Sequence, residues 1–331
     1  MSALDRLSSV RVAVDTLGGD HPPDEIVAGA LAAASDVIRP VLFGPAELDT
    51  GGLEHVVTEG AVEMDDKPAD VVRAKPDSSL VRAVRAVGDG AADAVVSAGN
   101  TGAMLAASLL HIRRLPGIHR PGIAVVIPAR DGPTVLIDSG ANADARPEHL
   151  LQFAHMGVLF ASEILGVPDP VVRLLSIGEE PEKGNQLTLE AYELLSASGL
   201  LFAGNTEGRR LLDGGGDVIV CDGFTGNVAL KTLEGTIRSV LGALRAEIVS
   251  TRFGRLGGLL IRPAGSRLRH RLDPENTGGG YLLGLRGIVV IAHGSSSRRA
   301  IASAIRLAAT GVEHRIVDAL AERVPSRSTI A

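Results

Sequence analysis

Short apolar runs alternate with amphipathic helical patterns along almost the whole chain, and this alternation restricts the fold more than any other feature of the sequence. The strand candidates are residues 10–14, 40–43, 93–97, 122–127, 134–138, 171–176, 200–204, 217–221 and 287–292. Helical patterns separate them, at 24–34, 79–87, 102–113, 147–165, 185–198, 227–250, 297–309 and 312–324. Continuous apolar runs between helices are typical of parallel strands buried on both faces. The chain is therefore predicted to be an α/β protein with a mostly parallel sheet covered on both faces.

Composition narrows the class of protein further. No shift in composition marks a domain boundary, so a single domain is predicted over residues 1–331. The formal net charge of -6 argues against nucleic acid as a partner. The single cysteine, Cys221, excludes an internal disulfide and fits a reducing cytoplasm. The N-terminus lacks the apolar core of a signal peptide, and no apolar run approaches the roughly 18–20 residues of a membrane span.

One segment departs from the alternation. Residues 248–272 contain six arginines and no acidic residue, and Phe253, Leu256 and Leu260 fall on one helical stripe. Pro263 and Gly265 are expected to break the helix. The segment 248–273 is therefore predicted to be a basic, amphipathic helical hairpin inserted before the last strand.

Glycine and small polar residues gather where the predicted strands end. The six stretches are VDTLGGD, SAGNTGA, DSGANAD, GNTEG, VCDGFTGN and AHGSSS. The carboxyl ends of parallel strands share one edge of a sheet, where ligands bind, and helix N-termini favour anions. A shared anion site on one edge is predicted. For any single stretch, helix capping or turn formation explains the same residues equally well.

Three further residues have two interpretations each. Lys183, in a loop with three glutamates, is a solvated charge or a cation facing the anion site. His293 is a general base or a packed turn residue. Cys221 is expected to be a small core residue, because a reactive thiol needs exposure and positive surroundings. The sequence contains neither nucleotide-binding glycine fingerprint and no recognised metal-ligand spacing, so no cofactor or metal is expected.

The strand-end motifs occur together with the longer motifs DSGANADARPEHLLQFAHMG, IGEEPEKGNQLT and VCDGFTGNVALKTLEG. On these motifs, the chain resembles the bacterial phosphate acyltransferase family known as PlsX from about residue 10 to residue 309. The resemblance implies transfer of a fatty acyl group from acyl carrier protein to inorganic phosphate, for phospholipid synthesis. It also implies a three-layer α/β/α sandwich related to isocitrate and isopropylmalate dehydrogenases, with homodimers and a hairpin that helps to bind the membrane. We therefore expect a cytoplasmic enzyme that is peripheral at the inner face of the plasma membrane. Its acyl phosphate product is expected to supply a glycerol-3-phosphate acyltransferase.

The resemblance and the residue types together suggest roles for individual residues. Lys183 and Asp222 are the catalytic candidates, with Lys183 offsetting negative charge and Asp222 orienting it or a phosphate proton. The phosphate- and substrate-binding candidates are Asp15, Gly18, Gly19, Asn100, Thr101, Asn142, Asn205, Thr225, Asn227, His293 and Ser295. The membrane and carrier-protein candidates are Arg252, Arg255, Leu259, Leu260 and Arg262. Transfer is expected to be direct, without an acyl-enzyme on Cys221.

The chain departs from the family's pattern in two places, and two other functions compete. Asp15-Thr16-Leu17-Gly18-Gly19-Asp20 replaces the usual Asp-Ala-Met-Gly-Gly-Asp, and the loop 277–284 also differs, which affects how that loop contacts the acyl chain or partner subunit. A dehydrogenase of the same fold would need a metal-binding aspartate cluster and an arginine-rich motif, and neither is present. A non-catalytic, membrane-docked scaffold for lipid-synthesis enzymes would form no acyl phosphate.

Overall fold

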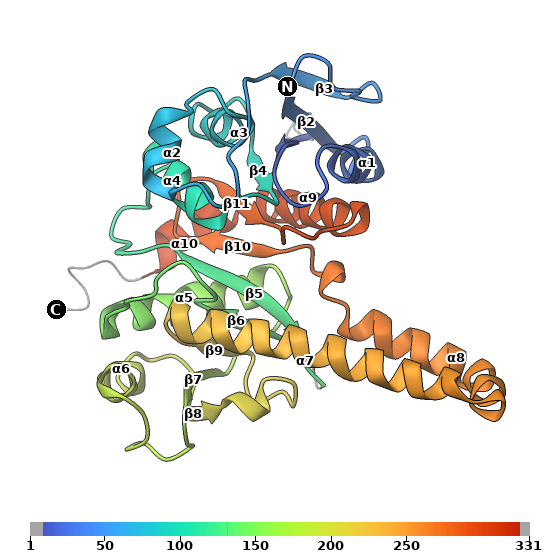
Figure 1. The fold of residues 1–331 in the computed structure, drawn as a ribbon. Coiled ribbons are helices and arrows are strands. Elements are labelled where there is room, and N and C mark those ends of the chain that lie inside the picture. The colour runs from blue at the N-terminus through green and yellow to red at the C-terminus, as the bar shows by residue number, and fades with distance from the viewer. Residues whose placement is uncertain (1–8, 131, 325–331) are drawn as a thin grey trace, which may run out of the picture.

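The computed structural model describes residues 9–130 and 132–324, which form one mixed sheet with helices on both of its faces (Figure 1). Most of the N-terminal segment, for which no signal peptide is predicted, and the residues after Val324 lie outside this part of the chain. The strands are β1 (Val10–Asp15), β2 (Ile38–Gly44), β3 (Glu54–Val57), β4 (Ala94–Ser97), β5 (Gly122–Pro128), β6 (Pro133–Ile137), β7 (Val172–Ser176), β8 (Phe202–Glu207), β9 (Val218–Val220), β10 (Gly280–Leu283) and β11 (Ile288–Ile291). The helices are α1 (Asp24–Ala33), α2 (Pro68–Ala74), α3 (Ser79–Gly88), α4 (Thr101–His111), α5 (Pro147–Glu163), α6 (Gln186–Ser196), α7 (Gly223–Ser250), α8 (Arg252–Leu272), α9 (Arg298–Glu313) and α10 (Ile316–Arg323), with short 3-10 turns η1 (Gly208–Arg210) and η2 (Pro274–Asn276).

All nine predicted strands are present, with ends that differ by up to three residues, and the predicted α/β class is confirmed. The sequence analysis missed β3, β10 and α2. β3 is a short edge strand with exposed or half-buried residues, so its apolar signal is weak. β10 begins at the last of three consecutive glycines, Gly278–Gly280, which look like a loop in the sequence.

The sheet has the strand order β3-β2-β1-β4-β11-β10-β5-β6-β9-β7-β8. Neighbours are parallel except around the middle, where β10 is antiparallel to β11 and β5, and β5 is antiparallel to β6. The two halves of the sheet therefore run in opposite directions.

This reversal corrects the prediction that all six polar stretches share one edge. The carboxyl ends of β1, β4 and β11 lie at one edge, and those of β6, β7, β8 and β9 point to the other. The register nevertheless keeps the two groups close, because Ile291 pairs with Gly280 and Val125 pairs with Leu136 across the central strands. The carboxyl ends of β11 and β6 therefore both lie near this line of paired residues, which crosses the central strands.

Helices cover both faces of the sheet, as the three-layer prediction requires. One face carries α1, α5, α6, α9 and α10, and the other carries α2, α3, α4 and α7. The first face buries the largest core, which includes Phe153, Phe160 and Tyr281. On the second face, α3 and α4 cover one core and the beginning of α7 covers a smaller one, so the strip of β5 between them has no helix directly on it.

The predicted hairpin exists, but its turn is at Thr251 and not at Pro263–Gly265. Its first limb is the distal part of α7, and α8 returns as one continuous helix with Pro263 inside it. The Thr251 hydroxyl caps α8 by accepting the Gly254 N–H at 2.9 Å. A side chain at Gly254 would collide with the backbone oxygen of Ile248, so glycine there permits the close reversal. The hairpin projects from the body of the molecule (Figure 1).

Candidate active site

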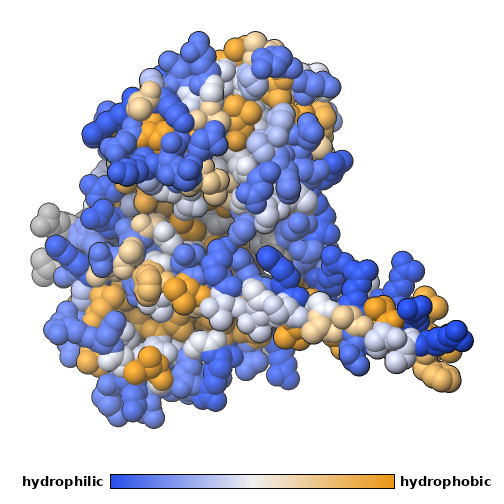
Figure 2. Space-filling model, viewed as in Figure 1, coloured by the Kyte–Doolittle hydropathy of each residue, from blue (hydrophilic) through white to orange (hydrophobic). Residues whose placement is uncertain are grey.

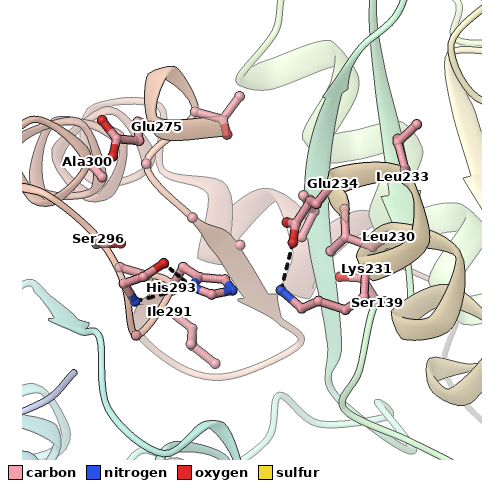
Figure 3. Close-up of a pocket in the computed structure, with 18 of the residues that line it drawn as sticks. Ser139, Leu230, Lys231, Leu233, Glu234, Glu275, Ile291, His293, Ser296 and Ala300 are labelled. Carbon is pink, nitrogen blue, oxygen red and sulfur yellow. Dashed lines mark hydrogen bonds and ion pairs between the residues drawn. The ribbon is translucent and has the colours of Figure 1, made fainter. Parts of the chain in front are cut away.

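A cavity of about 880 Å³ lies over the middle of the sheet, between the loop after β11 and the inner side of α7 (Figure 3). Its floor is β5, including Ile123, Val125 and Ile127. The cavity is within the usual range of about 300–1,000 Å³ for small-molecule sites. It lies where the sheet changes direction, the position at which open α/β sheets bind ligands.

Three glycine-rich loops form the polar end of the cavity. They follow β1, β4 and β11, and they contribute Asp20, Gly99, Thr101 and the stretch 293–296 to its wall. The loops pack backbone against backbone: the Asp20 N–H donates to the Gly294 carbonyl at 2.7 Å. A side chain at Gly18 would approach the Gly99 nitrogen to 2.6 Å, so only glycine allows this contact. Gly18 and Gly19 therefore shape the site without lining it.

His293 lies at the end of β11 and faces α7 across the cavity (Figure 3). Its Nδ1 accepts the Ser295 N–H at 3.2 Å and lies 2.9 Å from the Ser295 hydroxyl. Partial desolvation lowers the pKa of His293, and the positive charge of Lys231 lowers it further. The ring is thus neutral at pH 7, and because Nδ1 accepts, its proton is on Nε2. His293 offers the cavity an N–H donor.

The side of α7 that faces His293 carries a polar row. Asn227, Lys231, Glu234 and Arg238 recur at helical spacing and all line the cavity. Lys231 Nζ pairs with Glu234 at 2.9 Å, and Figure 3 shows the lysine reaching toward the loop that bears His293. Arg238 and Arg269 also line the cavity, and Lys231 is a cavity cation that the sequence analysis missed. Its signal was present in the sequence, since Lys231 follows Asn227 by four residues on the same helix.

The residues at the start of α7 have a capping role. Asp222 is the N-cap, and its carboxylate accepts the Thr225 N–H at 2.9 Å and the Thr225 hydroxyl at 2.7 Å. These bonds satisfy a free N–H of the first turn and fix the direction of the helix. Asp222 and Thr225 therefore set where Asn227 and Lys231 lie, while Asn227 itself reaches the cavity.

The loop after β6 brings the second half of the sheet to the cavity. Its buried Asp138 carboxylate accepts four backbone N–H groups, from Ile123, Gly140, Ala141 and Asn142, and also the Asn142 side-chain amide, all at 2.8–3.0 Å. Asn142 also donates to the Pro121 carbonyl at 2.7 Å. Asn142 thus stabilises the loop without lining the cavity, whereas Ser139 and Gly140 line it.

Lys183 and Asn205 lie away from the cavity. Lys183 is exposed in the loop between β7 and α6, and β9 and β6 separate β7 from the cavity floor. Asn205 is buried within β8 and donates to the Glu180 carbonyl at 2.8 Å, which anchors the same loop. Among the hydrogen bonds and ion pairs of the described residues, none joins Lys183 to Asp222. Their catalytic pairing stays a prediction.

Two further candidates stabilise the loops next to the cavity. Asp15 is buried and accepts hydrogen bonds from Ser79 at 2.5 Å and Ser97 at 2.7 Å, which joins β1, α3 and β4. Burial raises the pKa of Asp15 despite these bonds. Asn100 caps α4 and donates to the Met64 carbonyl at 2.9 Å. Neither lines the cavity; of the sequence candidates, Thr101, Asn227, His293 and Ser295 do.

Cys221 is a core residue, as predicted. It is 2% exposed, it packs with Leu136 and Ile219, and burial raises the pKa of its thiol well above the ordinary value. A thiolate nucleophile at this position is therefore disfavoured. Within the described residues, no group of three or more His, Cys, Asp or Glu side chains could hold a metal ion.

The fold is similar to that of solved phosphotransacetylases. The structure is similar to a EutD phosphotransacetylase from Staphylococcus aureus (TM-score 0.59, 17% identity, 92% of this chain and 94% of that chain covered). A phosphotransacetylase from Streptococcus pyogenes is equally similar (TM-score 0.60, 18% identity, the same coverage). At these identities the likeness concerns the fold.

Sequence comparison gives the family. The chain belongs to the family described as "Fatty acid synthesis protein", whose model matches residues 10–318. Relatives named phosphate acyltransferase include one from Heliobacterium modesticaldum (44% identity, 96% of this chain and 98% of the relative covered) and one from Staphylococcus aureus (42%, 95% and 98%). The predicted family is confirmed, and the chain is an acyltransferase that uses phosphate. The dehydrogenase and scaffold alternatives are set aside.

Proposed function

We propose that this enzyme transfers a fatty acyl group from the thioester of acyl carrier protein to inorganic phosphate and supplies acyl phosphate for phospholipid synthesis. The observation that carries the proposal is the cavity, which combines a polar end made by the loops after β4 and β11 with a cation on α7. The acyltransferase relatives support the reaction. The negatively charged carrier and the lipid pathway are inferred from the family resemblance.

The phosphate site is inferred to lie between Thr101, Ser295 and Lys231. Thr101 begins α4, whose N-terminus favours an anion, and Ser295 supplies a hydroxyl. Lys231 faces them from the opposite wall and offsets the negative charge. Phosphate is already an anion at neutral pH, so the enzyme does not need to generate a nucleophile.

Catalysis then depends on positioning and on stabilising the oxyanion. A phosphate oxygen attacks the thioester carbonyl, and the carbonyl oxygen becomes an oxyanion. Collapse breaks the C–S bond, and the leaving carrier thiolate takes up the proton that the phosphate loses, which gives acyl phosphate and the carrier thiol. Lys231 Nζ and His293 Nε2–H are the donors we assign to the oxyanion, because both face the middle of the cavity (Figure 3). One such donor typically contributes about 10²–10³ in turnover.

The reaction is tested by mixing the enzyme with acyl carrier protein bearing a long-chain thioester and with inorganic phosphate. We expect hydroxylamine-trapped acyl phosphate and free thiol to form in equal amounts, and only when phosphate is present. Acyl coenzyme A in a parallel reaction tests the choice of carrier. Thiol release without acyl phosphate would show a thioesterase and overturn the proposal.

The projecting hairpin is proposed to contact an anionic membrane. Phe253, Leu259 and Leu260 are 88%, 65% and 79% exposed, and Arg252, Arg255 and Arg262 lie on the same helix. Figure 2 shows hydrophobic and hydrophilic residues interspersed along this hairpin. Apolar side chains beside arginines suit binding in the interface of an anionic bilayer. No helix of the described chain is long and apolar enough to cross a membrane.

We also propose that the protein is a homodimer. The alternative role for the exposed apolar side chains of the hairpin is to contact the second subunit instead of the membrane. The double variant Leu259→Glu, Leu260→Glu is expected to lose sedimentation with phosphatidylglycerol vesicles and to remain dimeric in ultracentrifugation. Leu201→Glu is the matched control, since Leu201 is also exposed (56%) but lies on the body of the molecule. Loss of the dimer with unchanged vesicle binding would assign these leucines to the subunit interface instead.

A further inference from the structure

We propose that the apolar row on the inner side of α7 holds the alkyl chain of the acyl donor, with the chain running from Lys231 toward the base of the hairpin. The row consists of Leu230, Leu233, Ile237 and Leu241, which all line the cavity. This inference rests on the proposed function and adds where the chain lies and which residues limit its length.

The sequence of α7 produces two adjacent rows that face one cavity. The polar row 227–231–234–238 and the apolar row 230–233–237–241 both follow helical spacing and are offset by about one residue. A helix that only packs on a core carries its polar residues on the opposite, solvent-facing side. A cavity wall with a polar row beside an apolar row suits a ligand that has a charged head and a long apolar tail.

Burial separates the row into two parts. Leu230 and Leu233 also pack on the core beneath α7, with Ile127, Leu136 and Ile219. Ile237 and Leu241 are half-buried and are not part of any core cluster of the described chain, although they line the cavity. The far part of the row therefore faces the cavity without serving the fold.

The floor of the cavity continues the apolar lining. β5 contributes Ile123, Val125 and Ile127, alternate residues on the face of the sheet that carries α7. Leu272 closes the far side from the end of α8, where the charged residues Arg269 and Asp273 also line the cavity. Glu275 follows this end and is bound by Ser297 at 2.9 Å, which ties the returning limb of the hairpin to α9. The apolar part of the cavity is thus bounded on three sides by fixed elements.

The direction of the chain follows from the position of the polar groups. The reacting carbonyl belongs beside Lys231 and His293, at one end of the apolar row. At 1.5 Å per residue, Ile237 and Leu241 lie about 9 Å and about 15 Å further along the helix. We expect an octanoyl chain to end near Ile237, a dodecanoyl chain near Leu241, and a hexadecanoyl chain beyond it, at the hairpin base.

The first test measures binding and does not depend on turnover. Alkylphosphonates of increasing chain length carry a phosphate-like head and an unreactive tail, and calorimetry gives their affinities for the full-length enzyme. Affinity should rise up to about fourfold per methylene, equivalent to about 0.8 kcal/mol for each one buried, and then level off. Affinity that does not change with chain length would overturn the inference.

The second test introduces a large side chain at two positions along the apolar row. Leu241→Trp should lower turnover of hexadecanoyl carrier protein on the order of tenfold and leave the octanoyl donor unchanged, whereas Ile237→Trp should also impair the dodecanoyl donor. Val240→Trp is the control, because Val240 is on the same helix turn, 59% exposed, and does not line the cavity. If either tryptophan variant fails to fold, the Ile237→Ala and Leu241→Ala variants are titrated with the alkylphosphonates. Each alanine variant should bind the long-chain phosphonates less tightly than the wild type does.

The outcomes separate the two proposals. Formation of acyl phosphate with unchanged chain-length profiles in Leu241→Trp and Ile237→Trp keeps the proposed function and overturns the alkyl site. Chain-length-dependent phosphonate binding without acyl phosphate keeps the alkyl site and overturns the reaction. A change in subunit association in both variants, with no change in chain-length profile, would assign the row to a second copy of the chain.

Discussion

The position of α7 depends on a close contact at Gly226, and adding one methyl group there should disturb both the fold and the site. A Cβ on Gly226 would fall well inside van der Waals contact of the Asp138 backbone oxygen and 2.9 Å from the Cys221 sulfur. The carbonyl belongs to the loop that Asp138 holds rigid, so it cannot move aside cheaply. Gly226→Ala therefore forces α7 outward or breaks this loop.

The magnitude comes from two opposing effects. Gly→Ala inside a helix normally stabilises a protein by about 0.5–1 kcal/mol. Overpacking a buried contact costs about 1–3 kcal/mol, and a clash with backbone lies at the upper end. The free energy of unfolding of Gly226→Ala should fall by about 2 kcal/mol. Gly235→Ala on the same helix has no atom within 4 Å of the new methyl group, so it should be neutral or gain about 0.5 kcal/mol.

Urea denaturation followed by circular dichroism measures both variants against the wild type, and acyl-phosphate formation is measured on the folded proteins. We expect Gly226→Ala to lose activity as well as stability, because the displacement moves Asn227 and Lys231 relative to His293. Gly235→Ala should retain activity. A Gly226→Ala midpoint equal to that of the wild type would show that the contact is not as close as described, and equal losses in both variants would refute the role of Asp138.

Three further predictions concern Lys231, His293 and Cys221. Lys231→Met should lower turnover about 10²–10³-fold at saturating phosphate, and full activity would exclude Lys231 from the chemistry; Lys183→Ala in parallel shows whether the exposed loop lysine reaches the substrates. The same Lys231→Met change should raise the pKa of His293 in an NMR titration, since the charge of Lys231 lowers it, and an unchanged pKa would contradict this electrostatic effect. The unfolded chain binds that proton near pH 6.5 and the folded chain only below it, so the stability contributed by His293 falls as pH drops through this window. Folded Cys221→Ser should keep near-normal turnover, whereas a folded but inactive variant would refute direct transfer.

The sequence alone was sufficient to predict the local features of this protein. Apolar runs and helical periodicity predicted nine strands and most helices, because each is set by residues close together in the chain. Cys221 was correctly placed in the core, since it ends an apolar strand. The family was also evident, because its motifs are continuous stretches such as VCDGFTGNVALKTLEG.

Only the tertiary structure showed which of the polar residues meet. Asp222 and Asn227 are five residues apart in one motif, yet Asp222 caps the helix and Asn227 reaches the cavity. The turn of the hairpin is at Thr251, because a capped end and close-packed glycines there outweigh a proline in an exposed helix. Above all, the antiparallel strands β5 and β10 reverse the sheet, and strand direction is set by pairing between distant residues. That reversal divides the polar strand ends into two groups and places Lys231 opposite His293, which residue type and local spacing cannot specify.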